Sequence, residues 1–168
     1  KNQLIDLGIC EELSIESYYS QVRDRDDVSV LRCNKSGVIF LSGSDHMDLS
    51  HYEEQESFKY WSSQDRKHAI NVGHVDKLRR KELLQHIVTN KKWMDIGTGS
   101  GGILDELSPL ASQTHAVEPQ KIARESLKKL GYDISPSIEG TIERDFDVVT
   151  LFHVFEHFTN PLKDLKLI

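Results

Sequence analysis

An apolar segment that runs directly into a glycine-rich turn constrains the fold of this chain more than any other feature. Residues 93–102 are WMDIGTGSGG, so a short strand-like run is followed by glycines at alternate positions. Glycine has no Cβ, which allows a tight turn and a close approach of the backbone to a ligand. Gly101 and Gly102 would open the next helix, whose first N–H groups would face the same ligand. The segment therefore predicts a small-molecule site at the tip of the first strand of an α/β sheet.

The C-terminal half of the chain alternates between helix-like and strand-like periodicity. Such alternation predicts a Rossmann-like, doubly wound, mostly parallel α/β sheet with right-handed crossovers. Ligands of such sheets bind beyond the carboxyl ends of the strands. In chain order we expect a helix from residue 76, a strand at 93–96, a helix at 101–108, a strand at 114–118, a helix at 120–130, a short strand at 132–134, a helical turn near 136–143, a strand at 146–152 and a last helix from residue 160.

The expected helices carry end signals and apolar residues at helical spacing. We expect Gly131 to end the helix at 120–130, and Asn160 to cap the last helix with Pro161 at its first position. The residues expected to face the core are Leu78, Leu83, Leu84, Ile87 and Val88 in the helix from residue 76, and Ile122, Ala123, Leu127 and Leu130 in the helix at 120–130.

The N-terminal part is organised differently. Segments 28–33 and 37–41 are strand-like, and the turn signal between them predicts a β-hairpin. Residues 44–75 are polar and mixed, and we expect helical pieces there. This segment also carries the aromatics Tyr52, Phe58, Tyr60 and Trp61. We therefore divide the chain into an N-terminal hairpin and helical extension at 1–75 and an α/β domain at 76–168.

Composition narrows the class of protein. A net charge of −6 weighs against a nucleic-acid backbone as the main partner. No apolar run approaches the roughly 20 residues that span a bilayer, so we expect no membrane partner. Cys10 and Cys33 do not make a disulfide framework, which favours a reduced, cytoplasmic setting. The basic cluster at 77–81 is best interpreted as a solvated helix face.

Three features fall at the same end of the predicted sheet. The glycine turn follows the first strand, Glu118 ends the second strand, and His153 with its neighbours follows the fourth. A carboxylate at the end of the second strand suits a ribose, because it can accept hydrogen bonds from both hydroxyls. The turn, the acid and the periodicity together are a much stronger signal than the glycines alone.

Here the chain resembles the class I S-adenosylmethionine-dependent methyltransferases. Their first motif has the form acid-x-Gly-x-Gly-x-Gly, which Asp95 and the three glycines match. The resemblance implies that the turn wraps the methionine part of S-adenosyl-L-methionine and that Glu118 holds its ribose. It covers roughly residues 76–168. The cofactor-binding residues expected from it are Asp95, Gly97, Thr98, Gly99, Gly101, Glu118, Pro119 and Phe152.

Segment 146–161, FDVVTLFHVFEHFTNP, resembles the motif after the fourth strand in ubiquinone-type O-methyltransferases and sugar C-methyltransferases. It places the candidate catalytic residues at His153, Glu156 and His157. Three interpretations stay open: the Glu-His pair caps the helix and orders the loop, a histidine acts as general base, or the group holds a divalent ion. We predict no resident metal. The segment also matches the zinc-protease pattern H-x-x-E-H, but it follows a strand and is not expected to lie inside a helix.

The expected activity is O- or C-methylation of a small-molecule acceptor. A nucleotide-binding oxidoreductase is one alternative, since Gly97, Gly99 and Gly102 also fit G-x-G-x-x-G. The acid directly before the turn and the Glu-His pair favour the methyltransferase.

A catalytically incomplete regulatory or interaction module is the other alternative. The family sheet has seven strands in the order 3-2-1-4-5-7-6, and this chain stops in the helix after the fourth. Strand 146–152 would then be an exposed edge, which soluble proteins avoid. We expect a fragment of a longer protein, or an edge covered by a second copy or a partner chain.

The N-terminal hairpin resembles part of a zinc-binding module found in sugar C-methyltransferases. Arg32, Cys33 and Gly37 keep the frame of R-C-x-x-C-G, but Ser36 stands where the second cysteine would be. A thiolate-rich zinc site needs four ligands, so we interpret the hairpin as a metal-free relic that forms a lid or a substrate-side wall with the aromatics at 52–61. We expect surface positions for three arginines, with contact to an anionic substrate or the cofactor carboxylate as the alternative: Arg66, Arg79 and Arg80.

Overall fold

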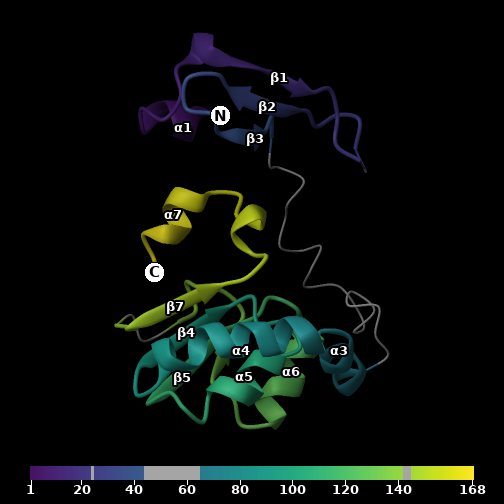
Figure 1. Cartoon of the computed structure of the whole chain (residues 1–168), viewed down its shortest axis with the longest axis vertical. Coiled ribbons are helices and arrows are strands. Elements are labelled where there is room, and N and C mark those ends of the chain that lie inside the picture. The colour runs from purple at the N-terminus through teal and green to yellow at the C-terminus, as the bar shows by residue number, and fades with distance from the viewer. Residues whose placement is uncertain (24, 44–64, 142–144) are drawn as a thin grey trace. The chain divides into compact units, whose positions relative to one another are not determined.

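The structure is a computed structural model that describes residues 1–23, 25–43, 65–141 and 145–168. The chain divides into two compact units, Lys1–Met47 and Asp48–Ile168 (Figure 1). Helix α3 (Arg66–Val72) groups with the second unit, whereas the sequence suggested a boundary at residue 75. The four aromatics at 52–61 lie outside the described residues. No described helix combines the length and apolar character that a membrane crossing needs.

The first unit is built on a three-stranded antiparallel sheet in the order β1-β2-β3. Helix α1 (Asn2–Asp6) and the 3₁₀ helix η1 (Glu12–Ser14) precede it. The predicted hairpin is confirmed, because Leu31 of β2 (Val30–Cys33) pairs with Phe40 of β3 (Ile39–Leu41). Strand β1 (Ile15–Tyr19) was not predicted as an element of its own. Four of its five residues are exposed, so its sequence lacks the alternation that marks a half-buried strand.

Cys10 and Cys33 are both free and buried in the first unit. The Ser14 hydroxyl lies 3.1 Å from Cys33 Sγ, and the Ser36 backbone N–H donates to the same sulfur at 3.4 Å. These hydrogen bonds, that of Ser14 first, lower the pKa of Cys33 to about 6. The Ser36 hydroxyl lies 3.8 Å from Cys10 Sγ. Both thiols are thus in contact with serine hydroxyls, and one of these serines, Ser36, stands where the zinc module would carry its second cysteine.

The second unit contains the parallel sheet that the periodicity predicted. Its strand order is β6-β5-β4-β7, and β4 pairs in parallel with both β5 and β7. Asp95 of β4 lies opposite Ala116 on one side and Thr150 on the other. The strands are β4 (Lys92–Ile96), β5 (Gln113–Val117), β6 (Ile134–Ser135) and β7 (Val148–Leu151).

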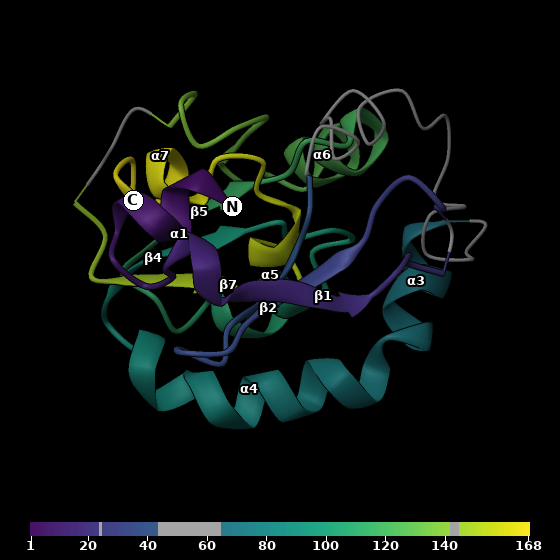
Figure 2. The same cartoon turned by 90° about the horizontal axis from the view of Figure 1, so that it is seen from above.

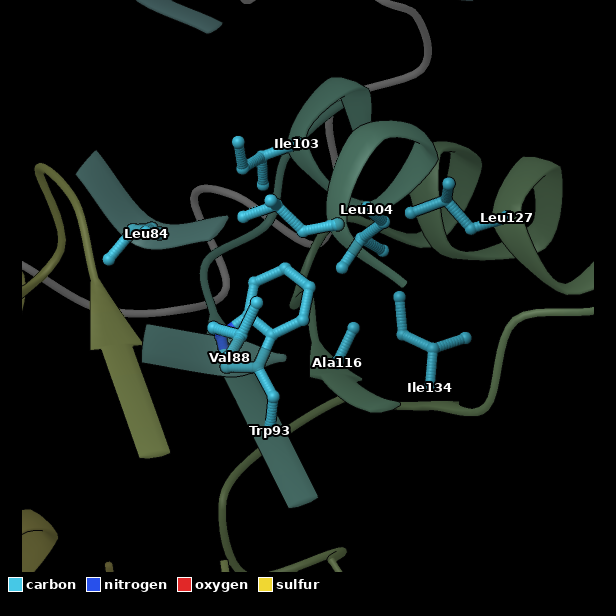
Figure 3. Close-up of a cluster of buried hydrophobic side chains, with 9 residues drawn as sticks. Leu84, Val88, Trp93, Ile103, Leu104, Ala116, Leu127 and Ile134 are labelled. Carbon is cyan, nitrogen blue, oxygen red and sulfur yellow. The ribbon is translucent and has the colours of Figure 1, made fainter. Parts of the chain in front are cut away.

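Helices cover both faces of this sheet. Figure 1 shows α5 and α6 on one side and α7 on the other, and Figure 2 shows α5 between α4 and α6. On the side of α5, Trp93 is fully buried among Leu104, Ala116 and Leu127 (Figure 3). The opposite face buries Met94 and its neighbours in a second cluster. The helices are α4 (His74–Val88), α5 (Gly102–Leu107), α6 (Lys121–Lys129) and α7 (Pro161–Leu165).

The predicted inward face of α4 is right for two of its five residues. Leu84 and Val88 are buried, but Leu78, Leu83 and Ile87 are 45%, 56% and 41% exposed. The side of α4 that packs on α5 is instead partly ionic. Lys77 and Lys81 both donate to Glu106 of α5, at 2.9 and 2.6 Å. The two hydrogen bonds, that of Lys81 first, lower the pKa of Glu106 to about 2.

In α6, Ala123 and Leu127 are buried and Ile122 is half-buried, as predicted. Leu130 is 56% exposed, so its predicted inward position was wrong. It lies past the last helical residue, where the chain turns away from the helix.

The predicted helix ends are confirmed where the local signals were strong. Gly131 follows α6 with φ of +88°, the left-handed conformation typical of a C-terminal glycine. The Asn160 side chain accepts a hydrogen bond from the Lys163 N–H at 3.2 Å, so it caps α7 with Pro161 in the first turn. Residues 136–141 form hydrogen-bonded turns in place of the expected helical turn, and 142–143 lie outside the described residues.

Candidate functional site

The glycine turn between β4 and α5 requires its glycines. Gly97, Gly99 and Gly101 have φ of +71°, +59° and +73°, a region that other residues enter only with strain. The turn is tied to the neighbouring strand, because the N–H groups of Gly97 and Thr98 donate to the Val117 carbonyl at 2.7 and 3.3 Å. The turn therefore lies across the carboxyl ends of β4 and β5, where the sequence placed it.

Two of the glycines also touch side chains from other elements. A Cβ added to Gly97 would lie 2.2 Å from Val154 Cγ2, and one added to Gly101 would lie 2.4 Å from Leu127 Cδ2. Val154 belongs to the segment that follows β7. The glycine turn and the segment after the fourth strand, which are far apart in the sequence, are therefore in direct contact.

Glu118 fastens the turn from the end of β5. Its carboxylate accepts hydrogen bonds from the Gly99 N–H at 2.7 Å and the Gln120 N–H at 2.8 Å, one on each oxygen. The residue is only 5% exposed. Burial raises its pKa, and the two backbone hydrogen bonds oppose that rise. Each carboxylate oxygen can accept a further hydrogen bond, so Glu118 retains acceptor capacity for a ligand.

Pro119 follows directly, and the carbonyls of Glu118 and Pro119 both accept from Arg124 Nη1 at 2.8 Å. These contacts fix the backbone that presents the Glu118 carboxylate.

Asp95 is a second buried carboxyl group at the same edge of the sheet. The Thr150 hydroxyl donates to Asp95 Oδ1 at 2.6 Å and itself accepts from the Trp93 indole N–H at 2.9 Å. Burial raises the pKa of Asp95 to about 6, against the opposing influences of Thr150, Thr98 and Arg80. The Thr98 hydroxyl is buried and makes no hydrogen bond of standard geometry within the described residues. The Asp95 carboxyl group is therefore buried from solvent, and the nearby Thr98 hydroxyl could still make a further hydrogen bond.

Arg80 of α4 reaches the same region. Its guanidinium lies over the Phe152 ring, 4.4 Å from the ring centre, and pairs with Asp76 one helical turn earlier. The Arg80 side chain is only 20% exposed, so the expected surface position was wrong. Arg79 next to it is 72% exposed and lies at the surface as expected.

Arg66 of α3 holds the glycine turn from its outer side. Its Nε donates to the Ser100 carbonyl at 2.8 Å, and its Nη2 pairs with Asp105 of α5 at 2.7 Å. The side chain is 20% exposed, which again corrects the expected surface position. Its bonds to the turn are positioning contacts that no sequence motif indicated.

The three candidate catalytic residues lie in the segment that touches Gly97 through Val154. His153 has φ of +56°, a strained conformation for a side-chain-bearing residue, and its side chain is 77% exposed. Its Nδ1 lies 3.7 Å from Glu156 Oε1, so the two form an ion pair when His153 is protonated. His157 is half-buried at the end of the 3₁₀ helix η3 (Phe155–His157).

This segment is a strand end, a kink and a short 3₁₀ turn. It does not form the continuous helix of a zinc protease. Within the described part of the chain, no group of three or more His, Cys, Asp or Glu side chains could hold a metal ion.

A family model described as a methyltransferase domain matches residues 75–168. The chain belongs to this methyltransferase-domain family. The match and the strand order together confirm the class I resemblance and the Rossmann-like α/β fold. The branch and the truncation of the methyltransferase domain stay predictions.

Two solved structures are similar to this chain. One is the plantazolicin methyltransferase BpumL in complex with SAH, with 20% identity and a TM-score of 0.46 over 71% of this chain and 54% of that one. The other is a candidate RNA methyltransferase from Pyrococcus horikoshii, with 22% identity and a TM-score of 0.41 over 60% of this chain and 52% of that one. The chain thus spans about half the length of these proteins. No match was found among curated proteins.

The chemistry of the residues at this edge fits S-adenosylmethionine. The two hydroxyls of its ribose need hydrogen-bond acceptors. Its methionine end carries an ammonium and a carboxylate, and the protein backbone around it must leave room for it. Glu118 and Asp95 supply buried acceptors, Arg80 supplies a cation, and the glycine turn supplies a backbone with positive φ at three positions.

Proposed function

We propose that the methyltransferase domain binds S-adenosyl-L-methionine and methylates a small-molecule acceptor on oxygen or carbon. One observation carries the proposal: the buried carboxyl groups of Asp95 and Glu118 flank a glycine turn that Glu118 itself fastens. Buried carboxyl groups with raised pKa values cluster at functional sites more often than elsewhere. Both lie beyond or at the carboxyl ends of adjacent parallel strands, where ligands of this fold class bind.

Seven of the eight predicted cofactor residues, all but Asp95, have a direct contact role in this proposal. Glu118 accepts hydrogen bonds from the ribose hydroxyls with the lone pairs that the backbone leaves over. Gly97, Gly99 and Gly101, with Thr98 between them, line the path of the methionine part. Pro119 and Phe152 supply apolar walls.

The bound cofactor supplies a methyl group that its sulfonium has already activated. The work left to this chain is positioning, which holds the acceptor in line with the methyl group and excludes water.

Methyl transfer also requires that the acceptor loses a proton. The candidate groups for accepting this proton are His153, Glu156 and His157. We propose that His153 accepts the proton from an oxygen or carbon nucleophile and that Glu156, 3.7 Å away, stabilises the resulting cation. A purely structural role of the Glu-His pair, and a divalent ion held by these side chains, are the competing interpretations. Substitution His153→Gln separates the base from a purely structural role, because it should abolish turnover while cofactor binding is retained, and a chelator that leaves wild-type turnover unchanged would rule out the divalent ion.

Calorimetric titration tests the cofactor proposal. We expect wild-type protein to bind S-adenosylmethionine and S-adenosylhomocysteine, and Glu118→Ala to weaken both at least tenfold. Glu125→Ala, an exposed glutamate on α6, is the matched control and should leave binding unchanged. A folded wild-type protein that binds neither ligand would refute the proposal, and binding of a nicotinamide dinucleotide instead would support the oxidoreductase alternative.

A cofactor-binding but catalytically incomplete module is the second candidate. Strand β7 stands at the edge of the described sheet, with β4 as its neighbour. A covering segment, second copy or partner chain would complete the acceptor side of such a module. Methyl transfer from labelled cofactor to a panel of phenols, sugar nucleotides and small metabolites distinguishes the two. Binding without any turnover favours the module.

A further inference from the structure

A groove lies between helices α3 and α6 of the second unit. The two helices meet where the small side chains of Ala69 and Ala123, both buried, pack together (Figure 1). Between the same helices the surface is hollowed to a volume of about 510 Å³, within the roughly 300–1,000 Å³ typical of small-molecule sites. None of the eight predicted cofactor-binding residues lines this groove. It is therefore distinct from the candidate cofactor site.

Three cationic side chains line the groove, and no carboxylate of the described residues does. Arg66 and Lys67 come from the first turn of α3, and Lys129 comes from the last turn of α6. This local excess of positive charge contrasts with the net charge of −6 of the whole chain. Cations that line one groove repel one another, so an anion bound there is favoured by all three.

Most of this positive charge is not neutralised by the protein. The side chains of Lys67 and Lys129 make no hydrogen bond or ion pair with any described residue. Arg66 pairs with Asp105 through Nη2 and donates from Nε to the Ser100 carbonyl, but its Nη1 has no partner among the described residues. Two ammonium groups and part of a guanidinium therefore remain for a ligand.

The other lining residues indicate what carries the negative charge. Ile70 and Leu130, the latter 56% exposed, form an apolar wall, and Asn71 and Ser126 add neutral hydrogen-bonding groups. A bare ion would fill little of the volume and gain nothing from the apolar wall. A phosphate ester suits several cations better than a carboxylate does, because it carries about two negative charges and three strong acceptor oxygens.

We propose that the groove between α3 and α6 binds a small organic phosphate. The phosphate group lies among Arg66, Lys67 and Lys129, and the apolar body of the ligand lies against the wall formed by Ile70 and Leu130. The inference does not depend on the proposed function, because no residue of the groove is assigned to the cofactor or to the acceptor.

Calorimetric titration with 1-naphthyl phosphate tests this inference, and 1-naphthol and inorganic phosphate are the matched ligands. We expect wild-type protein to bind 1-naphthyl phosphate at least tenfold more tightly than either, with no competition from S-adenosylhomocysteine. Lys67→Gln and Lys129→Gln should each weaken its binding at least threefold, and together at least tenfold. Leu130→Ser should weaken 1-naphthyl phosphate at least threefold and leave inorganic phosphate unchanged, because it alters only the apolar wall.

Lys128→Gln is the matched control. It removes the same charge from the neighbouring position of α6, but Lys128 does not line the groove and pairs with Glu125 at 3.8 Å. We expect this variant to bind 1-naphthyl phosphate as tightly as wild-type protein does.

The outcomes separate this inference from the proposed function. If folded wild-type protein binds S-adenosylhomocysteine but not 1-naphthyl phosphate, the groove site is overturned and the proposed function stands. The groove site is equally wrong if 1-naphthol binds as tightly as its phosphate, or if Lys128→Gln weakens binding as much as Lys129→Gln does. Competition with S-adenosylhomocysteine, with full affinity in the Lys67→Gln/Lys129→Gln variant, would place the ligand at the cofactor edge and also refute it.

Discussion

Substitution Gly97→Ala tests the contact between the glycine turn and the segment after β7. The structure indicates two separate contributions by which this substitution lowers the free energy of unfolding. The residue has φ of +71°, and an L-residue in that conformation costs about 1–2 kcal/mol. The new Cβ would also lie 2.2 Å from Val154 Cγ2, and overpacking of this kind costs about 1–3 kcal/mol. We therefore expect the free energy of unfolding to fall by about 2–5 kcal/mol.

Urea unfolding of matched variants separates the two costs. Gly131→Ala has a similar φ of +88° but no atom within 4 Å of the new Cβ, so it should show the conformational cost alone. The double variant Gly97→Ala/Val154→Ala removes the clash and should recover the difference between Gly97→Ala and Gly131→Ala. Binding of S-adenosylhomocysteine, followed in the same variants, should weaken most in Gly97→Ala.

The reasoning fails if Gly97→Ala and Gly131→Ala lose the same stability, because Val154 would then not restrict Gly97. It fails equally if truncation of Val154 recovers nothing. Either result would mean that the turn and the segment after the fourth strand are not in the contact described above.

Two further predictions concern the buried carboxyl group of Asp95. Its pKa is raised from 3.8 to about 6, so the stabilisation of its neutral form is complete below pH 3.8 and is lost as the pH rises through 6. Asp95→Asn should therefore raise the free energy of unfolding by up to about 3 kcal/mol at pH 7.5, and by much less at pH 4.5, while it weakens cofactor binding. Equal effects at the two pH values in urea titrations would contradict this. Thr150→Val leaves Asp95 and the Trp93 indole N–H without their shared partner, and should lower the free energy of unfolding by about 1–3 kcal/mol. A thermal melt unchanged from wild type would show that this hydroxyl is dispensable.

The fold was predictable where the signal was local. The alternation of strand and helix periods predicted the parallel sheet, and the pairing of β4 with β5 and β7 bears it out. Asn160 and Gly131 marked helix ends correctly because a cap depends on a few neighbouring residues. The glycine turn was recognisable for the same reason, since positive φ at alternate positions leaves glycine as the ordinary choice.

The predictions were wrong where contacts with other elements decide which residues are buried. Leu83 and Ile87 of α4 have the spacing of a core face, yet they are exposed while Lys77 and Lys81 turn inward to Glu106. Periodicity records which residues are apolar and does not record which face meets another helix. A lysine whose apolar stem is covered and whose ammonium is paired can occupy such a face.

The candidate site shows the same difference between residues that a local sequence signal marks and residues that only tertiary contacts reveal. Asp95, Glu118 and the glycines could be singled out from the sequence because they lie at or just beyond the ends of strands at characteristic positions. Thr150 lies in an apolar run and carries no motif, although its hydroxyl joins the Trp93 indole to the Asp95 carboxyl group. Arg80 was expected at the surface, as its neighbour Arg79 is.

The sequence by itself determined the family, the order of the strands in the parallel sheet, and the glycine turn and carboxyl groups at the strand ends, because each depends on chain-local spacing and backbone conformation. Only the tertiary structure decided that Arg80 stacks on Phe152, that Arg66 holds the glycine turn, and that Val154 packs on Gly97. These contacts join segments far apart in the chain. The charge and burial of each group depend on neighbours that the linear order does not specify.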